Sequence, residues 1–262
     1  MIRAELHCHT NYSMDGMMSL DQVFNTARKV KLDVLAITDH DEIEGAFELQ
    51  RLVNNRRSGP EIIVGEERTL GDGSHLIGLF LERKIESTVF EEAVDEIYDQ
   101  GGLCVVPHPF RKKDGLCRDS MACLDYFGSR PAGFEIYNAK CSYETNRLAQ
   151  LEEHGLCPCG GSDAHYASDL GESISLIERS AGTSLRSLIE AMFVSRRGFQ
   201  LMGKAQRASS GERRYTPAYY KVKPFLRLPK AALPLAKSVY RTYRDFRYGI
   251  GDKTSVAVYD SH

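Results

Sequence analysis

Six of the eight histidines stand in short motifs beside apolar runs, and three carboxylates are interleaved with them. The nine residues are His7, His9, Asp15, His40, Glu67, His75, His108, Asp163 and His165. Neutral imidazoles and carboxylates, without thiolates, suit divalent ions such as Mn, Zn or Fe. Nine potential ligands are more than one ion takes, so the pattern predicts a site for several metal ions.

Two of the motifs share one spacing. His7 and His9 are two residues apart at the end of an expected strand, so their side chains point to the same side. Asp163 and His165 repeat this spacing later in the chain. Taken alone, the first pair could equally be two surface histidines on an edge strand, and each other histidine has a similar explanation without metal. Taken together, the motifs would require six separate coincidences.

Two pairs of adjacent residues require a choice. Neighbours on a strand point to opposite faces. We expect His40 to be a ligand and Asp39 to orient it from behind. Of Glu66 and Glu67, only one is expected to face the site, and alternation alone does not say which.

The elements that position these residues alternate between strands and helices. Strands are expected at residues 2–6, 34–37, 62–64, 76–81, 103–106, 134–137 and 157–160, and helices at 19–30, 42–55, 89–100, 142–154 and 184–197. This alternation indicates βαβ units with parallel strands. About seven strands favour an α/β barrel, which gathers functional groups at the C-terminal ends of its strands. An open doubly wound sheet would draw its site from fewer strands.

Composition excludes some classes of protein. No apolar stretch is long enough to span a membrane, and the first residues lack the pattern of a secretory signal. The seven cysteines show no pairing pattern, so we expect reduced thiols and a cytoplasmic protein. Cys157 and Cys159 resemble half of a zinc ribbon whose second half is missing, so a structural cysteine zinc site is not expected.

The charge is distributed unevenly. The net charge of −2 combines residues 1–200, with 21 Lys+Arg and 32 Asp+Glu, and residues 201–262, with 13 and 4. We therefore divide the chain into a domain at 1–200 and a basic, Tyr- and Pro-containing C-terminal extension at 201–262, with a basic helix expected at 231–248. The favoured interpretation is an extension packed on the barrel. Contact with RNA through its basic residues is the alternative, and contact with an anionic membrane is the least favoured.

Together the motifs resemble the PHP (polymerase and histidinol phosphatase) family of metal-dependent phosphoesterases. The resemblance rests on His7-x-His9, Asp15, Thr38-Asp39-His40, Gly65-x-Glu67, His75, Pro107-His108-Pro109 and Ser162-Asp163-x-His165, in the family's order from residue 2 to about 200. It implies a distorted (β/α)7 barrel. The Gly-x-Glu pattern of the family selects Glu67 over Glu66.

The resemblance also implies two to three divalent ions. The first would be held by His7, His9, Glu67 and Asp163, the second by Glu67, His75 and His108, and the third by Asp15, His40 and His165. The placement of His75 is the least secure, because the spacing after the glutamate varies in this family.

Such a centre suits a phosphate ester. Three carboxylates offset about half of the roughly +6 formal charge of three divalent ions. The nucleophile would be a water activated by the ions, so neither serine nor cysteine is needed. We expect Asp39 or Asp163 to relay protons to the leaving group. Arg111 is expected to clamp a substrate phosphate, although it and the two lysines that follow could equally form a solvated basic loop.

The expected substrate is a phosphorylated small molecule or nucleotide. The compact chain and the short segment between Glu67 and His75 are similar to the stand-alone, nucleotide-directed branch of the family. Alternatives are a 5′–3′ exonuclease on short RNA, a histidinol-phosphatase-like monoesterase and a non-catalytic, metal-stabilised regulatory module. An amidohydrolase-like reaction on a C–N bond is less favoured, because it would leave Asp15, His40 and His165 without a role.

Overall fold

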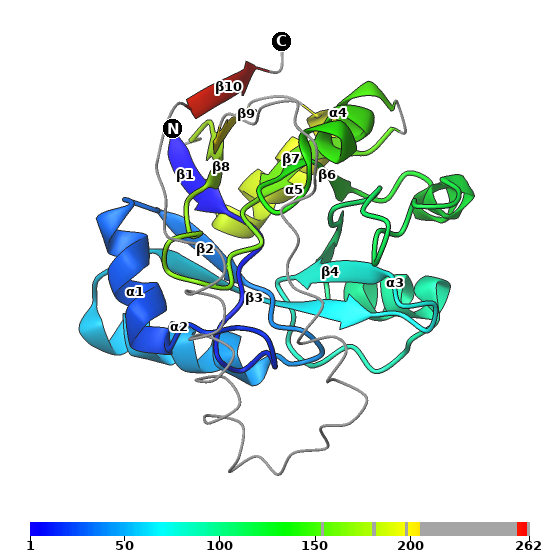
Figure 1. The fold of residues 1–262 in the computed structure, drawn as a ribbon. Coiled ribbons are helices and arrows are strands. Elements are labelled where there is room, and N and C mark those ends of the chain that lie inside the picture. Colours follow the sequence, from blue (N-terminus) through cyan, green and yellow to red (C-terminus); the bar gives the residue numbers. More distant parts are fainter. Residues whose placement is uncertain (153–154, 180–181, 197–198, 205–255, 261–262) are drawn as a thin grey trace, which may run out of the picture.

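The apolar runs of the chain form strands that join in one ten-stranded sheet. The computed structural model describes residues 1–152, 155–179, 182–196, 199–204 and 256–260. The strands are β1 (Ile2–Glu5), β2 (Val34–Ile37), β3 (Glu61–Thr69), β4 (His75–Leu79), β5 (Leu103–Val106), β6 (Ala132–Asn138), β7 (Cys157–Gly161), β8 (Ser173–Ile177), β9 (Phe199–Lys204) and β10 (Val256–Asp260). Their order is β10-β9-β8-β1-β2-β3-β4-β5-β6-β7, and the sheet curls into a nearly closed barrel (Figure 1).

The helices pack on the outside of the strands. They are α1 (Leu20–Lys29), α2 (Glu44–Arg56), α3 (Phe90–Asp99), α4 (Tyr143–Leu151) and α5 (Leu185–Ser195), with a short 3-10 helix at Ala122–Phe127. α1 begins with a capping box, since Ser19 Oγ accepts from the Gln22 backbone and the Gln22 side chain accepts from the Ser19 backbone N–H. Ser142 and Ser184 cap α4 and α5 in the same position.

The prediction of a distorted α/β barrel is confirmed, but its strands are not all parallel. β1, β2 and β3 pair in parallel, as do β5, β6 and β7. β4 runs antiparallel to both β3 and β5, because the short turn after Thr69 leads straight into it. A tight turn can only join antiparallel strands, since a parallel partner needs a long crossover. The expectation of purely parallel strands was therefore wrong for β4.

The loops that follow β1 and β7, the first and last strands of the predicted barrel, lie next to each other. An isolated bridge joins Cys8 and Ala164, just beyond the ends of β1 and β7. The buried Glu5 carboxylate reinforces this junction by accepting from the backbone N–H of Ser162 at 3.0 Å and of His7 at 3.2 Å. The loops that carry the first and last histidine motifs are thus held side by side.

Three strands, β8, β9 and β10, were not predicted from the sequence. β8 pairs antiparallel with β1, β9 with β8 and β10 with β9. β9 runs across the expected boundary at residue 200, and β10 belongs to the expected extension. The division at residue 200 remains a prediction. The basic helix expected at 231–248 lies outside the described residues.

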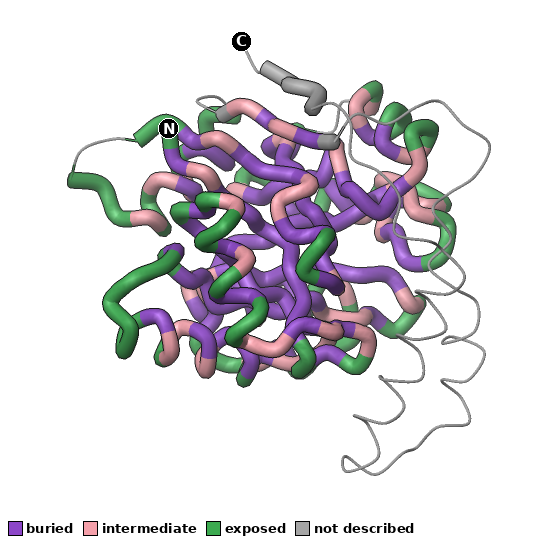
Figure 2. Tube along the Cα trace, turned by 60° about the vertical axis from the view of Figure 1, so that its left-hand side comes forward, coloured by how far each residue is buried: buried purple, intermediate pink, exposed green. Residues whose placement is uncertain are grey.

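Buried apolar side chains fill the inside of the fold, and exposed residues lie on its outer turns and helices (Figure 2). All four residues of β2 and of β5 are buried, as expected for strands covered on both faces. The seven cysteines are free, and all except Cys123 are buried. No helix in the described part of the chain is long and apolar enough to cross a membrane.

Candidate metal centre

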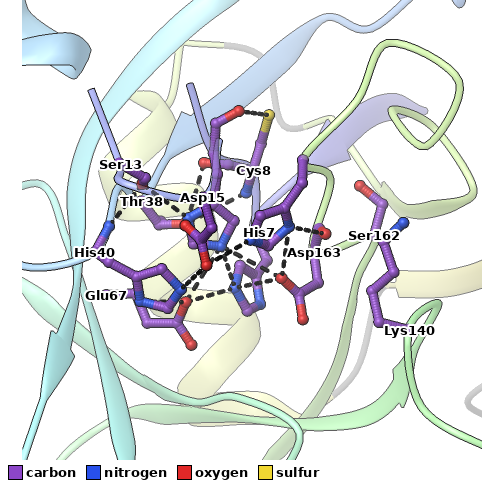
Figure 3. A network of polar contacts seen from close by, with 12 residues as sticks. His7, Cys8, Ser13, Asp15, Thr38, His40, Glu67, Lys140, Ser162 and Asp163 are labelled. Atoms are coloured by element: carbon purple, nitrogen blue, oxygen red, sulfur yellow. Dashed lines mark hydrogen bonds and ion pairs between the residues drawn. The ribbon is translucent and has the colours of Figure 1, made fainter. Parts of the chain in front are cut away.

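The nine predicted ligands converge at one end of the barrel. Most of them follow a strand directly: His7 and His9 follow β1, His40 follows β2, and Asp163 and His165 follow β7. Figure 3 shows the labelled ligands of these strands pointing toward one another. Glu67 lies near the end of β3.

His75 reaches the site because β4 is reversed. It is the first residue of its strand, which in a parallel strand would place it at the opposite end of the barrel. In the antiparallel hairpin, His75 instead pairs with Thr69 at the end of β3. Its Nδ1 lies 2.9 Å from Glu67 Oε1. The reversal of β4 therefore explains how this least secure of the predicted ligands joins the others.

Four side chains form a first cluster with the spacing of a tetrahedral metal site. His7 Nε2 lies 3.1 Å from His9 Nε2, 3.1 Å from Glu67 Oε2 and 3.6 Å from Asp163 Oδ1. His9 Nε2 lies 3.2 Å from the same glutamate oxygen and 3.3 Å from the aspartate oxygen. Bonds of about 2.0–2.1 Å to a tetrahedral ion place ligand atoms about 3.3 Å apart. All four residues are buried, so the cluster fits one enclosed divalent ion.

Glu67 links this cluster to a second one. Its Oε2 faces His7 and His9, whereas its Oε1 lies 2.9 Å from His75 Nδ1 and 2.9 Å from His108 Nε2. Asp114, which the sequence analysis did not single out, lies next to these two histidines. One carboxylate therefore divides its two oxygens between two potential metal sites. Glu66, its neighbour, faces away and accepts from the Ile85 backbone.

The third cluster is more open. Asp15 Oδ2 lies 3.5 Å from His40 Nε2 and 3.4 Å from His165 Nε2. These side chains are 13–18% exposed, whereas Glu67 is fully buried. Asp15 Oδ1 and His40 Nδ1 are buried without a hydrogen-bond partner, as expected of atoms that await a cation. The third cluster is thus the most accessible of the three.

Asp39 contacts the loop that follows His9. Its carboxylate accepts from the N–H and hydroxyl of Thr10, at 2.6 and 2.7 Å, and from the N–H and hydroxyl of Ser13, at 3.2 and 2.7 Å. The Ser13 hydroxyl in turn accepts from the backbone of His40. Asp39 therefore holds in place the loop that leads to Asp15. This arrangement favours an anchoring role over the relay of protons, which remains untested.

Arg111 contacts Asp163, one of the predicted ligands. Its Nη1 donates to Asp163 Oδ2 at 2.7 Å, and its Nε donates to Asp114. The Asp163 oxygen that faces the histidines is the other one, Oδ1. Arg111 thus fixes the orientation of Asp163, and its side chain remains 21% exposed. A clamp on substrate phosphate remains a prediction. Lys140, two residues after β6, pairs with Asp169 at 2.6 Å.

The electrostatics show what the carboxylates do in the absence of metal. Burial opposes protonation of His7, but Glu67, Glu135 and Asp163 outweigh burial and raise its pKa well above the usual range. The pKa of His9 rises to about 9, because its carboxylate neighbours outweigh burial in the same way. His40 differs, since burial lowers its pKa to about 3. A dense group of buried anions thus draws cations to the first cluster.

Several residues that support the site carried only a weak signal in the sequence. Glu135 contacts His7, Glu5 joins β1 to the β7 loop, and Asp114 lies beside His108. Glu5 and Glu135 are each the single acidic residue of a mostly buried strand. A charge in a buried strand is costly without a partner, and that cost is the signal that could have identified them.

Comparisons with known proteins agree with this geometry. Residues 5–101 match the PHP domain, and residues 145–192 match the PHP-associated domain. An uncharacterized protein of Methanocaldococcus jannaschii is 32% identical over 149 residues, which cover 53% of this chain and 82% of that protein. The chain belongs to the PHP family of metal-dependent phosphoesterases.

Two further proteins resemble this chain over a shorter segment or at lower sequence identity. A 5′–3′ exoribonuclease of Haemophilus influenzae is 34% identical over 82 residues, which cover 30% of this chain and 29% of that enzyme. The structure is similar to a two-domain protein of Bacteroides vulgatus that contains a predicted PHP-like metal-dependent phosphoesterase. The TM-score is 0.60 at 18% identity, covering 76% of this chain and 64% of that one. At this identity the likeness concerns the fold.

Proposed function

We propose that this PHP protein hydrolyses the phosphate ester of a nucleotide or small phosphorylated metabolite, with a water activated at a centre of two or three divalent ions. The observation that carries the proposal is the divided carboxylate of Glu67. Its two oxygens face two different clusters of potential ligands. His40 of the third cluster lies 3.4 Å from one of these oxygens, Oε2. Closely spaced ions are suited to ester displacement at phosphorus, because both the attacking and the leaving oxygen need stabilisation.

The donor set fits such ions. His7, His9, Glu67 and Asp163 would hold the first, Glu67, His75 and His108 the second, and Asp15, His40 and His165 the third. Bound divalent ions supply Lewis acidity and an activated water as the nucleophile. The protein's own part is to exclude bulk water from the first two clusters, to orient Asp163 through Arg111, and to leave the side of Asp15 open for the ester.

Two other observations support a nucleotide or RNA as the substrate. The relative from Haemophilus influenzae acts on RNA, which supports a nucleotide or RNA 5′ end over histidinol phosphate. Arg111, Lys112 and Lys113 add positive charge beside the His108 loop and favour an anionic substrate. A non-catalytic module would not need to retain all nine ligand-type residues, so we favour an enzyme.

A screen of phosphate release tests this proposal. The full chain supplied with Mn²⁺ is assayed against nucleoside mono- and bisphosphates, sugar phosphates, histidinol phosphate and short 5′-phosphorylated RNA. We expect release from at least one nucleotide or RNA, and no release by the wild type with any of these substrates would contradict the proposal.

His40→Ala tests the third cluster. The change removes a partly exposed ligand while leaving the buried first cluster intact, so we expect phosphate release to fall at least about 100-fold, the range seen when a group that supports the transition state is lost. Thermal unfolding should remain close to that of the wild type. Retained activity in a correctly folded variant would remove the third cluster from the proposal.

Binding of RNA by residues 201–262 is a separate proposal that rests on their charge. Replacing Arg241, Arg244 and Arg247 with glutamate should weaken binding of a short RNA and flatten its salt dependence, because fewer counterions are released. Hydrolysis of a small phosphomonoester serves as the control and should be unchanged. Equal RNA binding by the variant and the wild type would contradict this role.

A further inference from the structure

One buried carboxylate behind the metal centre contacts ligands of two clusters at once. Glu135 lies in β6 and is 2% exposed. Its Oε1 lies 2.9 Å from His7 Nδ1, on the side of the ring that faces away from the first cluster. Its Oε2 accepts from the His108 backbone N–H at 2.8 Å and from Asn138 Nδ2 at 2.9 Å. Each oxygen therefore serves a different potential metal site.

The contact with His7 determines how that ring presents itself. A proton on Nδ1 that is donated to Glu135 leaves the Nε2 lone pair free, and Nε2 is the atom that faces Glu67 and His9. A carboxylate behind a ligating histidine fixes its tautomer and raises its basicity. Glu135 is thus in position to prepare His7 for binding an ion.

The contact with His108 acts on its backbone. His108 has a positive φ of 31°, which is uncommon for a residue with a side chain. Such conformations persist where surrounding contacts hold them. The hydrogen bond from its N–H to Glu135 is one of these contacts, and the resulting conformation directs Nε2 to within 2.9 Å of Glu67 Oε1.

The neighbouring strand leaves room for this carboxylate. Gly161 at the end of β7 lies between Glu135 and His7, and a Cβ at that position would overlap Glu135 Oε1 and approach His7 Cβ to 2.6 Å. The glycine has no positive φ in this structure, so it is required for its small size. A strand residue without a side chain at this point allows β6 to support a ligand that follows β1.

We propose that Glu135 is a positioning residue shared by the first two metal sites, and that it sets the affinity of both for divalent ions. The inference rests on the proposed function only in so far as the clusters bind metal. It predicts that the loss of one side chain that need not touch metal weakens two sites together. A carboxylate that only stabilised the barrel would have no such effect.

Glu135→Gln tests the inference with little change in shape. The amide can still accept from His7, but its NH₂ group would then oppose the His108 N–H and the Asn138 amide, so one of the two supports is lost. We expect Mn²⁺ affinity, measured by calorimetric titration, to fall about 10- to 100-fold, the usual effect of losing a partner of a metal ligand. The visible spectrum of the Co²⁺ form should also shift.

Glu66→Gln is the matched control. It also alters a fully buried glutamate of the barrel, but Glu66 contacts the Ile85 backbone and none of the ligands. We expect its Mn²⁺ affinity and Co²⁺ spectrum to equal those of the wild type. Glu135→Asp, which retains the charge but shortens the reach, provides a second variant should the glutamine form fail to fold, and it should also bind Mn²⁺ more weakly.

Wild-type Mn²⁺ affinity and an unchanged Co²⁺ spectrum in a folded Glu135 variant would overturn the inference. These titrations use no substrate, so they are separate from the test of hydrolysis. A protein that binds ions tightly through Glu135 but releases no phosphate would defeat the proposed function and leave the positioning role standing.

Discussion

Glu67→Gln should lower the turnover of phosphate release at least about 1,000-fold. Glu67 approaches all three clusters: Oε2 faces His7 and His9, Oε1 faces His75 and His108, and His40 Nδ1 lies 3.4 Å from Oε2. An amide has one acceptor oxygen, so it cannot serve two ions. A loss of about 4 kcal/mol of stabilisation in the transition state corresponds to this factor.

Glu66→Gln separates this effect from a general loss of stability. The two glutamates are adjacent on β3 and both fully buried, but they point to opposite faces of the strand. Burial raises the pKa of Glu66 to about 7, so an amide is a mild replacement there. The turnover and metal content of the Glu66→Gln variant should equal those of the wild type. Metal analysis that finds the wild-type number of ions in Glu67→Gln would contradict the bridging role.

Removal of metal is the second change with a large expected effect. The centre brings three carboxylates and six histidines together, and without cations this arrangement must be neutralised by protons. Chelation should abolish hydrolysis and lower the temperature of unfolding. Each ion supplied at 100 times its Kd contributes about 2.7 kcal/mol to the free energy of unfolding. Scanning calorimetry of the metal-free and Mn²⁺-supplied protein measures the difference.

The difference in unfolding temperature between the metal-free and the Mn²⁺-supplied protein should grow with pH. In the metal-free protein the pKa of His9 is raised from 6.5 to about 9, so its protonated form stabilises the fold fully below pH 6.5, and this contribution is lost as pH rises through 9. His7 shifts in the same direction. The loss is about 3 kcal/mol for a shift of this size. His40 titrates at about 3, below this window.

Metal binding has the opposite dependence, because ligands must lose their protons to bind an ion. Between pH 6.5 and 9.5, the metal-free protein should therefore lose stability, whereas the affinity for Mn²⁺ should rise. Thermal unfolding of both forms at three pH values checks this. Parallel changes in the two forms would show that the buried histidines do not carry protons in the metal-free state.

The convergence of the nine predicted ligands followed from the sequence, because strand ends are where a barrel gathers its functional groups. The order of the motifs placed His7, Glu67 and Asp163 on strands that the structure brings together. The reversal of β4 was not visible, because a strand's direction depends on the turn that joins it to its neighbour. β8 was not predicted, because its buried serines, Ser173 and Ser175, interrupt the apolar pattern of the strand.

The supporting residues were harder to predict, because their roles depend on distances in space. Asp39 stands beside His40 in the sequence, yet it binds the loop of Thr10 and Ser13. Arg111 was expected to face substrate, yet its partner is a carboxylate 52 residues away. A motif predicts which side chains would hold metal, whereas the contacts behind them arise from elements that only the folded barrel places together.

The reversed strand also brings a turn next to the loop that follows His108. The turn between β3 and β4 opens at the same end of the barrel as the ligands, and Asp72 in this turn pairs with Arg118 of the loop that follows His108. The hairpin tip is thus joined by an ion pair to the loop that follows His108. The same loop carries Asp114, which lies beside His75 and His108, so a change in the length of the hairpin tip would reach the second cluster through the pair of Asp72 and Arg118.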